Sequence, residues 1–295
     1  MASEPKLHHY VPRFYLKVFS SPTEKLWVWD KAERKVYQSS PNGVAAQTYF
    51  YRVPEFIGSD VDPLFLEKDL ARLEAEAAVV FASCVATLDT LKSPERLELS
   101  GDNRWLISTF LAVQFLRTAE QREILSLYAE GSGLYKKEIN SNKRANLHAQ
   151  MLCSGGLVES LRDHIHGCIW MYARNDTTIP FWTSDNPVCF KTGDNRIWLK
   201  AVGIFSPGAY LVFPLSPKYV LYCKEPEHWK ALQKWDSILS PVELTDEMVL
   251  HKNGGQVFMA TRHVISPVGE FAWANEFADT INTDGQAPGQ ESDVS

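Results

Sequence analysis

The sequence predicts an α+β fold in which a helical central region packs against a mainly antiparallel sheet. Three observations favour this class. Short β-prone runs separated by turns occupy about the first fifty residues. Apolar residues then recur at helical spacing between about residues 62 and 174. After residue 179 the chain returns to short strands and ends in one more helical pattern, so N- and C-terminal strands are expected to build the sheet together.

The N-terminal region is expected to form a small β layer. Residues 26–30 and 35–38 are rich in Trp, Val and Tyr and flank a charged turn, which is the pattern of a hairpin. Residues 47–53 form a further β-prone run. Before them, residues 8–19 combine two histidines, an arginine and four aromatic rings. Because chain termini are normally polar and loose, this apolar cluster predicts a segment that is docked on the core.

Three helical segments are predicted in the centre of the chain. The first covers residues 62–91, with Asp62 as its N-cap and a proline directly after it. The second covers residues 100–128. After a polar and charged run from Lys136 through Arg144, the chain is expected to become helical again to about Arg174. Two adjacent glycines, Gly155 and Gly156, are expected to kink or split the third helix.

The C-terminal third is expected to hold short strands followed by a helix. The strands are predicted at residues 179–183, 188–190, 197–199, 210–213 and 219–222. A helix is predicted at 241–266, with an interruption at Asn253–Gly255 as an alternative. Residues 283–295 consist mainly of Gln, Gly, Ser, Asp and Pro and predict a disordered tail, which leaves residues 1–282 as a single domain.

The composition is that of a soluble cytoplasmic protein. The net charge of −6 argues against a surface coated with positive charge for duplex DNA, although a local basic groove is compatible with it. No secretory signal opens the chain, and its apolar stretches are too short for a membrane span. The five cysteines are widely spaced and form no C-x-x-C pair, which indicates buried thiols in a reducing compartment.

The first candidate site is the histidine pair His8 and His9 with the neighbouring Arg13. Imidazole titrates near neutral pH and binds metals, so either histidine can act as a general base or as a ligand. The arginine adds a group that binds anions. The structural alternative is that both histidines hydrogen-bond inside the aromatic cluster and only fasten the N-terminus.

The second candidate is Gln114 with Arg117 in the second predicted helix. At helical spacing both share a face with Phe110 and Val113. A guanidinium on an apolar face must be paired or must line a cavity, because an unpaired charge there costs several kcal/mol. Its planar fork suits a carboxylate or a phosphate ligand. An internal aspartate is the structural alternative.

The third candidate is the sequence Ser184-Asp185-Asn186, which follows a strongly apolar predicted strand and precedes a proline. In the functional interpretation, Asp185 lies at the mouth of the sheet as a base, a metal ligand or the partner of Arg117. In the structural interpretation, the three side chains bond to the local backbone of a tight turn.

Several of these segments together resemble the domain-of-unknown-function family numbered 4238. The resemblance covers about residues 6–268 and implies a soluble, mostly bacterial protein with no established activity, so it carries over no catalytic residue. The segments that carry it are His8-His9-Tyr10-Val11-Pro12-Arg13-Phe14-Tyr15-Leu16, Gln114 to Thr118, Thr183-Ser184-Asp185-Asn186-Pro187, Phe213-Pro214-Leu215-Ser216-Pro217 and Asn253 to Val264.

The favoured hypothesis is a hydrolase that cleaves phosphodiesters in the manner of a nuclease. His8 or His9 as a base, the guanidinium of Arg117 and the carboxylate of Asp185 would meet in one cleft, with a divalent metal ion as a cofactor that the residues permit but do not require. The residues expected to bind substrate in this cleft are Arg13, Gln114, Ser184 and Asn186.

Two alternatives stay open. In the first, the same cleft is a binding module for a small anionic ligand or a nucleotide, with Arg117 on the anion and tryptophans stacking on the ring; nucleic acid is a further partner of this chemistry. In the second, the chain is an interaction or scaffold protein without catalysis, and the candidate residues form a buried structural network. The sequence leaves the oligomeric state and any metal ligands undefined.

Overall fold

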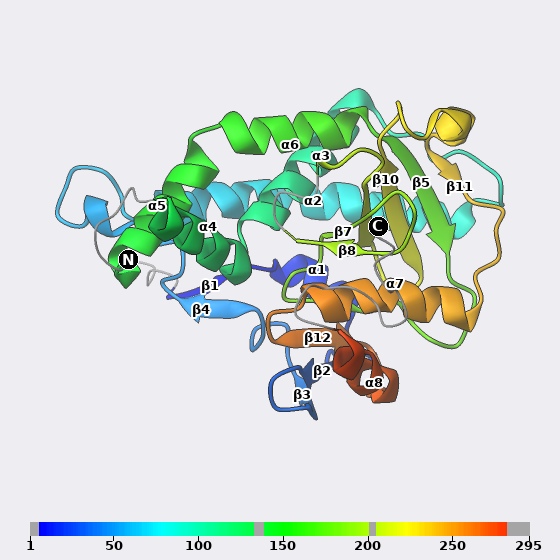
Figure 1. Ribbon diagram of the computed structural model, residues 1–295, viewed down its shortest axis with the longest axis horizontal. Coiled ribbons are helices and arrows are strands. Elements are labelled where there is room, and N and C mark those ends of the chain that lie inside the picture. The colour runs from blue at the N-terminus through cyan, green and yellow to red at the C-terminus, as the bar shows by residue number, and fades with distance from the viewer. Residues whose placement is uncertain (1–5, 133–138, 201–204, 282–295) are drawn as a thin grey trace, which may run out of the picture.

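The computed structural model describes residues 6–132, 139–200 and 205–281 and confirms the predicted α+β class (Figure 1). A group of helices lies beside the largest sheet, and a smaller sheet made of strands from both ends of the chain lies below it, next to the last two helices. The predicted tail at residues 283–295 falls outside the described residues. The single-domain assignment stays a prediction.

Within the described residues, the strands form three sheets. The largest has six strands in the order β11-β5-β10-β9-β7-β8, and its pairs are antiparallel except for β11 and β5. The strands of this sheet are β5 (Ile169–Arg174), β7 (Cys189–Lys191), β8 (Trp198–Leu199), β9 (Tyr210–Pro214), β10 (Tyr219–Lys224) and β11 (Ile238–Leu239).

The other two sheets bring the N-terminal strands to their partners. In the four-stranded sheet β3-β2-β12-β6, the N-terminal β2 pairs with the C-terminal β12, as the shared sheet predicted from the sequence requires. The third sheet pairs β1 with β4. These strands are β1 (Leu7–His9), β2 (Leu26–Asp30), β3 (Lys35–Ser39), β4 (Ala46–Thr48), β6 (Thr183–Ser184) and β12 (His263–Ser266).

Four of the described helices, α3, α4, α5 and α7, begin at a short polar side chain that caps them. Ser100, Thr118, Asn140 and Thr245 each accept the backbone N–H three residues ahead, which satisfies an otherwise unpaired donor. The α-helices are α1 (Arg13–Val18), α2 (Phe65–Thr90), α3 (Gly101–Leu116), α4 (Ala119–Gly131), α5 (Ser141–Cys153), α6 (Gly156–Gly167), α7 (Asp246–Met259) and α8 (Ala272–Thr280), with 3-10 turns η1 (Pro54–Phe56) and η3 (Lys230–Trp235).

The central helices differ from the sequence prediction at their ends. Asp62 does not cap α2; it accepts the N–H of Leu64 in the turn that precedes the helix. The region predicted as the second helix forms two helices, because α3 ends at Leu116 and Thr118 caps the start of α4. The split predicted at Gly155 is confirmed: this glycine has a φ of 76°, which other residues rarely adopt.

Two predicted helices also contained strands. Residues 169–174 form β5 in the largest sheet, because this run of Ile, Trp, Met and Tyr is paired on both sides, by β10 and β11. The predicted helix 241–266 is α7 followed by β12, and the reversal between them occurs at residues 260–262. α7 continues through Asn253–Gly255 without a break.

The glycine pair in α7 permits close packing on two sides. A Cβ on Gly254 would lie 3.1 Å from Phe277 of α8, and a Cβ on Gly255 would lie 2.5 Å from Trp198 of β8. Since real Cβ atoms do not approach other atoms that closely, glycine at position 255 lets α7 lie directly against the tryptophan ring.

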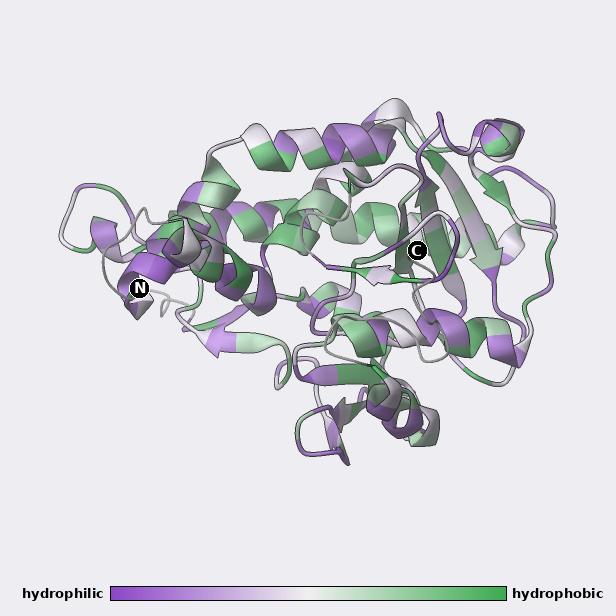
Figure 2. Cartoon of the chain, viewed as in Figure 1, coloured by the Kyte–Doolittle hydropathy of each residue, from purple (hydrophilic) through white to green (hydrophobic). Residues whose placement is uncertain are grey.

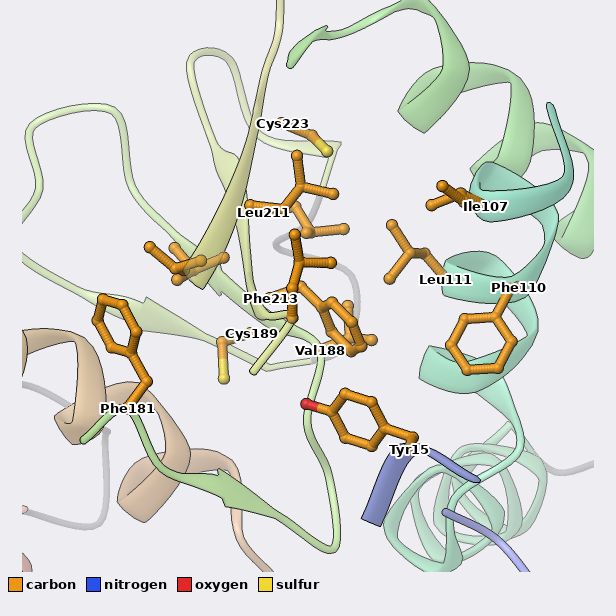
Figure 3. Close-up of a cluster of buried hydrophobic side chains, with 14 of the residues drawn as sticks. Tyr15, Ile107, Phe110, Leu111, Phe181, Val188, Cys189, Leu211, Phe213 and Cys223 are labelled. Atoms are coloured by element: carbon orange, nitrogen blue, oxygen red, sulfur yellow. The ribbon is translucent and has the colours of Figure 1, made fainter. Parts of the chain in front are cut away.

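The hydrophobic core fills the space between α3 and the largest sheet (Figure 3). In Figure 2 the strands of the largest sheet are mainly hydrophobic, whereas helices such as α6 carry both hydrophobic and hydrophilic residues. The predicted docking of residues 8–19 is confirmed. Tyr15 is buried against the core, stacks on Phe213, and donates its hydroxyl to the carbonyl of Pro214 at 2.8 Å while lying 2.9 Å from Thr183 Oγ1.

None of the helices in the described part of the chain is both long enough and apolar enough to cross a membrane.

Candidate functional site

A polar pocket opens beside the N-terminal segment, with a volume of about 450 Å³. Strand β1, the first residue of α1, the loop after β3 and one face of α2 enclose it. Its lining residues are Lys6, Leu7, His9, Arg13, Asn42, Glu67 and Glu74. We refer to it below as the N-terminal pocket.

Local structure explains how the side chains reach this pocket. Pairing of β1 with β4 holds His9 opposite Ala46, and the following Val11-Pro12 step leads into α1, where Arg13 is exposed at the first turn. On α2, Glu67 and Glu74 are seven residues apart and therefore lie on one face, two turns from each other.

Arg117 is buried next to this pocket and bonds to two of its lining residues, Glu74 and His9. Its Nη1 contacts Glu74 Oε1 at 2.7 Å, its Nη2 donates to the carbonyl of His9 at 2.7 Å, and its Nε donates to the Tyr51 hydroxyl at 3.1 Å. The Arg117 side chain is only 2% exposed. Its partner is thus a glutamate of α2, where an aspartate was the structural alternative considered from the sequence.

The ring of His9 presents an unused nitrogen. Its Nε2 is buried and has no hydrogen-bond partner among the described residues. Burial lowers the pKa of His9 below its ordinary value. The backbone of Asn42 and of Pro41 opposes this shift, whereas the guanidinium groups of Arg13 and Arg117 reinforce it. A neutral imidazole with a bare nitrogen can accept a proton from a bound molecule.

His8 and Glu67 form a second contact at the same place. The Nδ1 of His8 accepts the backbone N–H of Tyr51 at 2.9 Å, so that nitrogen carries a lone pair. Oε2 of Glu67 lies 3.6 Å from the same Nδ1. Burial raises the pKa of Glu67 to about 7, and the neighbouring Glu74 acts in the same direction against the opposing effect of Arg117.

At pH 8 the Glu67→Gln protein is expected to have a free energy of unfolding that exceeds the wild-type value by on the order of 2 kcal/mol. The raised pKa means that the folded state holds this proton up to about pH 7, whereas the unfolded chain releases it near pH 4.5. The free energy of unfolding of the wild type therefore falls as the pH rises between these values, and Glu67→Gln removes that decrease.

Urea denaturation between pH 4 and pH 8 measures this effect. Glu76, which is exposed on the same helix, supplies the matched control: Glu76→Gln should follow the wild-type pH dependence. A Glu67→Gln protein whose stability depends on pH as the wild type does would show that Glu67 is ionised normally.

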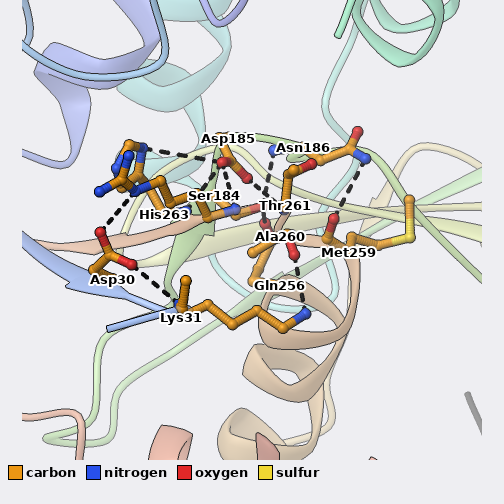
Figure 4. Close-up of polar contacts among 12 residues, drawn as sticks. Asp30, Lys31, Ser184, Asp185, Asn186, Gln256, Met259, Ala260, Thr261 and His263 are labelled. Carbon is orange, nitrogen blue, oxygen red and sulfur yellow. Dashed lines mark hydrogen bonds and ion pairs between the residues drawn. The ribbon is translucent and has the colours of Figure 1, made fainter. Parts of the chain in front are cut away.

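Asp185 lies in a different network, at the turn between α7 and β12 (Figure 4). Its two carboxylate oxygens accept the backbone N–H groups of Thr261, Arg262 and His263 at 2.8–3.0 Å. Burial raises the pKa of Asp185, whereas His263 and the three N–H donors oppose that effect. The arrangement holds the reversal between the helix and the strand.

The neighbours of Asp185 are also engaged within the fold. Ser184 donates its hydroxyl to Gln256 Oε1 at 2.8 Å, and Asn186 contacts Glu120 and the carbonyl of Met259. Gln114 donates to the carbonyl of Tyr10 at 2.9 Å, while its own Oε1 is buried without a partner in the described structure.

The structure therefore brings only part of the predicted set together. His9 and Arg13 line the N-terminal pocket, and Arg117 contacts His9 from below. Ser184, Asp185 and Asn186 bond instead to α7 and to the turn that follows it. Among the residues that the structure describes, no group of three or more His, Cys, Asp or Glu is arranged to hold a metal ion.

The sequence reasoning missed Glu67 and Glu74. A signal was present, because residues 67, 70, 74, 77 and 81 recur at the spacing of one helix face, and the other three are the apolar Leu70, Ala77 and Phe81. Two carboxylates on an otherwise apolar stripe need buried partners or a cavity. They have both, in Arg117 and the N-terminal pocket.

Comparison with known proteins gives one result. A family model described as "Protein of unknown function (DUF4238)" matches residues 7–268. No curated protein and no solved structure matches the chain.

Proposed function

We propose that this chain, which belongs to the DUF4238 family of proteins of unknown function, is a hydrolase that cleaves a phosphodiester in the N-terminal pocket. The observation that carries the proposal is that two buried atoms at this pocket, His9 Nε2 and Glu67 Oε2, have no hydrogen-bond partner among the residues that the structure describes and lie next to the exposed cation Arg13. A proton acceptor, a proton donor and an anion-binding group are the parts that such a reaction needs.

The substrate would enter with its phosphate against Arg13 and Lys6. A guanidinium matches two phosphate oxygens with two parallel N–H donors, whereas an ammonium acts as a compact point charge. Both side chains are exposed, so they remain free to close on a ligand. Arg117 does not touch substrate in this proposal; it positions Glu74 and the backbone of His9.

The two unpartnered atoms would carry the proton transfers. Nε2 of neutral His9 takes a proton from the attacking water, and the carboxyl of Glu67 gives its proton to the departing oxygen. Each role matches the protonation state that burial favours, because the pKa of His9 is lowered and that of Glu67 is raised to about 7. These proton transfers do not require a divalent metal ion, so hydrolysis is compared with and without one.

Glu67→Gln is expected to reduce kcat by about 100-fold or more, the usual contribution of a general acid. Hydrolysis of single-stranded DNA, RNA and bis(p-nitrophenyl) phosphate, each with EDTA, Mg²⁺ or Mn²⁺, measures the loss. Glu76→Gln on the same helix should retain full activity. Because Glu67→Gln is expected to be more stable than the wild type, unfolding cannot account for the loss.

The pH profile supplies a second arm of the test. Activity should rise as His9 loses its proton below pH 6.5 and fall as Glu67 ionises near pH 7, which places the optimum on the acid side of neutrality. A wild-type protein that hydrolyses none of these substrates, or a Glu67→Gln protein that hydrolyses them at the wild-type rate, would refute the proposal.

A further inference from the structure

A second and larger pocket, of about 730 Å³, lies between α7 and α8 and shares no residue with the N-terminal pocket. It falls within the size range of small-ligand sites. His251 and Lys252 form its basic wall, and Trp273 and Phe277 form its aromatic wall. The other lining residues are Asn195, Glu247, Met248 and Leu250.

A row of basic side chains on the sheet continues the basic wall. Lys191 on β7 lies opposite Tyr210 on β9, which in turn lies opposite Lys224 on β10, so the three side chains share a face of the sheet. α7 packs on β7, and Nζ of Lys191 lies 2.5 Å from Nε2 of His251. Three lysines, Lys191 on β7, Lys224 on β10 and Lys252 on α7, are thereby gathered beside His251. Burial and the neighbouring Lys191 and Lys252 lower the pKa of His251 to about 4, so its ring is a neutral hydrogen-bond partner.

These amines have aromatic neighbours instead of carboxylates. Nζ of Lys191 lies 4.5 Å from the Trp198 ring centroid, and Nζ of Lys224 lies 3.6 Å from that of Trp229. In the described part of the chain the lysines that form salt bridges are others. Lys191 is 0% exposed. A buried ammonium without a counter-ion is costly, so the fold keeps these charges at the expense of stability.

The titration of the amines agrees with this geometry. Burial and the neighbouring Lys252 lower the pKa of Lys191 to about 7, with Asp194 opposing them. Burial likewise lowers the pKa of Lys224 and of Lys252 to about 8. An anion in the pocket would relieve this mutual repulsion.

The aromatic wall offers a flat surface. Trp273 and Phe277 stack with their centroids 4.8 Å apart, and both rest on Gly254, where a side chain would displace them. Asn195 and Glu247 add exposed polar groups at the pocket, where they can meet the polar edge of a ring or a sugar.

We propose that this pocket binds a small ligand that joins phosphate groups to a flat ring, that is, a nucleotide. The phosphates lie against Lys252 and His251, with Lys191 and Lys224 behind them, and the ring packs on Trp273 and Phe277. The site is separate from the N-terminal pocket and does not depend on hydrolysis there.

Calorimetric titration and thermal shift with ATP, pyrophosphate and adenosine test the proposal. ATP is expected to bind and raise the melting temperature by several degrees, pyrophosphate to do so more weakly, and adenosine least. Lys252→Gln should weaken ATP binding at least tenfold. Lys230→Gln, which removes the same charge from an exposed position on η3, should not change it.

The variants also report on the cost of the basic cluster. Without ligand, Lys252→Gln and the volume-conserving Lys191→Met are expected to melt above the wild type, because each removes a repelled ammonium. Glu67→Gln, which lies in the other pocket, should bind ATP normally, so failure of the hydrolase proposal would leave this result intact.

Three results would overturn the inference. One is the absence of any response to ATP and pyrophosphate. Another is equal binding by Lys252→Gln and Lys230→Gln. The third is a ligand-free Lys252→Gln or Lys191→Met protein that melts below the wild type, because the amines would then stabilise the folded state.

Discussion

The Arg117→Ala protein is expected to lose about 3–5 kcal/mol of its free energy of unfolding. The guanidinium is buried and joins Glu74, the carbonyl of His9 and the hydroxyl of Tyr51, three groups from separate segments of the chain. Removing it leaves a half-buried carboxylate and a buried carbonyl without their donor. Urea denaturation monitored by tryptophan fluorescence measures the loss.

A matched surface pair provides the control. Arg72 contacts Asp69 on the same helix as Glu74, but both side chains are more than half exposed. Arg72→Ala should therefore leave the denaturation midpoint almost unchanged, since exposed pairs contribute little. Equal midpoints for Arg117→Ala and Arg72→Ala would mean that the buried network does not stabilise the protein.

Asp185→Ala is the second replacement with a large expected effect, about 3–5 kcal/mol. It removes both oxygens that accept the N–H groups of Thr261, Arg262 and His263. The turn between α7 and β12 would lose its internal support, and β12 pairs with both β2 and β6. Denaturation by urea again gives the loss directly.

Asp185→Asn separates the role of the oxygens from that of the charge. Asparagine keeps the size and one acceptor, so it should lose less stability than alanine does. Asp194→Ala, at an exposed carboxylate, should lose less still. If Asp185→Ala instead unfolds at the wild-type midpoint, the carboxylate does not stabilise the fold. The functional interpretation of Asp185 from the sequence would then be favoured.

Much of the fold could be predicted because hydrophobic periodicity and turn signals are local. The apolar spacing of α2, the hairpin of β2 and β3, and the strands β9 and β10 all follow from nearby residues. Residues 169–174 could not be assigned in this way. A short apolar run is ambiguous between helix and strand, and its two strand partners lie about 50 and 67 residues further along the chain.

The candidate site was less predictable, because a buried polar residue in a sequence does not reveal its partner. Arg117 needed an anion, but nothing near it in the chain singled out Glu74, 43 residues earlier. His9 and Arg13 were found because they stand in an unusual cluster near a terminus. Lys191 and Lys252 were not assigned to a site, since a single lysine at the end of a strand or inside a helix is ordinary until the fold brings several together.

The docking of Tyr15 has a consequence for how the protein is made. Its hydroxyl meets Thr183 and Pro214, which lie 168 and 199 residues later, and β2 pairs with β12, beyond residue 262. A ribosome adds roughly 5–20 residues per second, so the first strands wait about ten seconds or longer for their partners. During that interval the apolar surface of residues 8–30 is uncovered on the nascent chain, and the central helices have time to assemble before the two ends close over them.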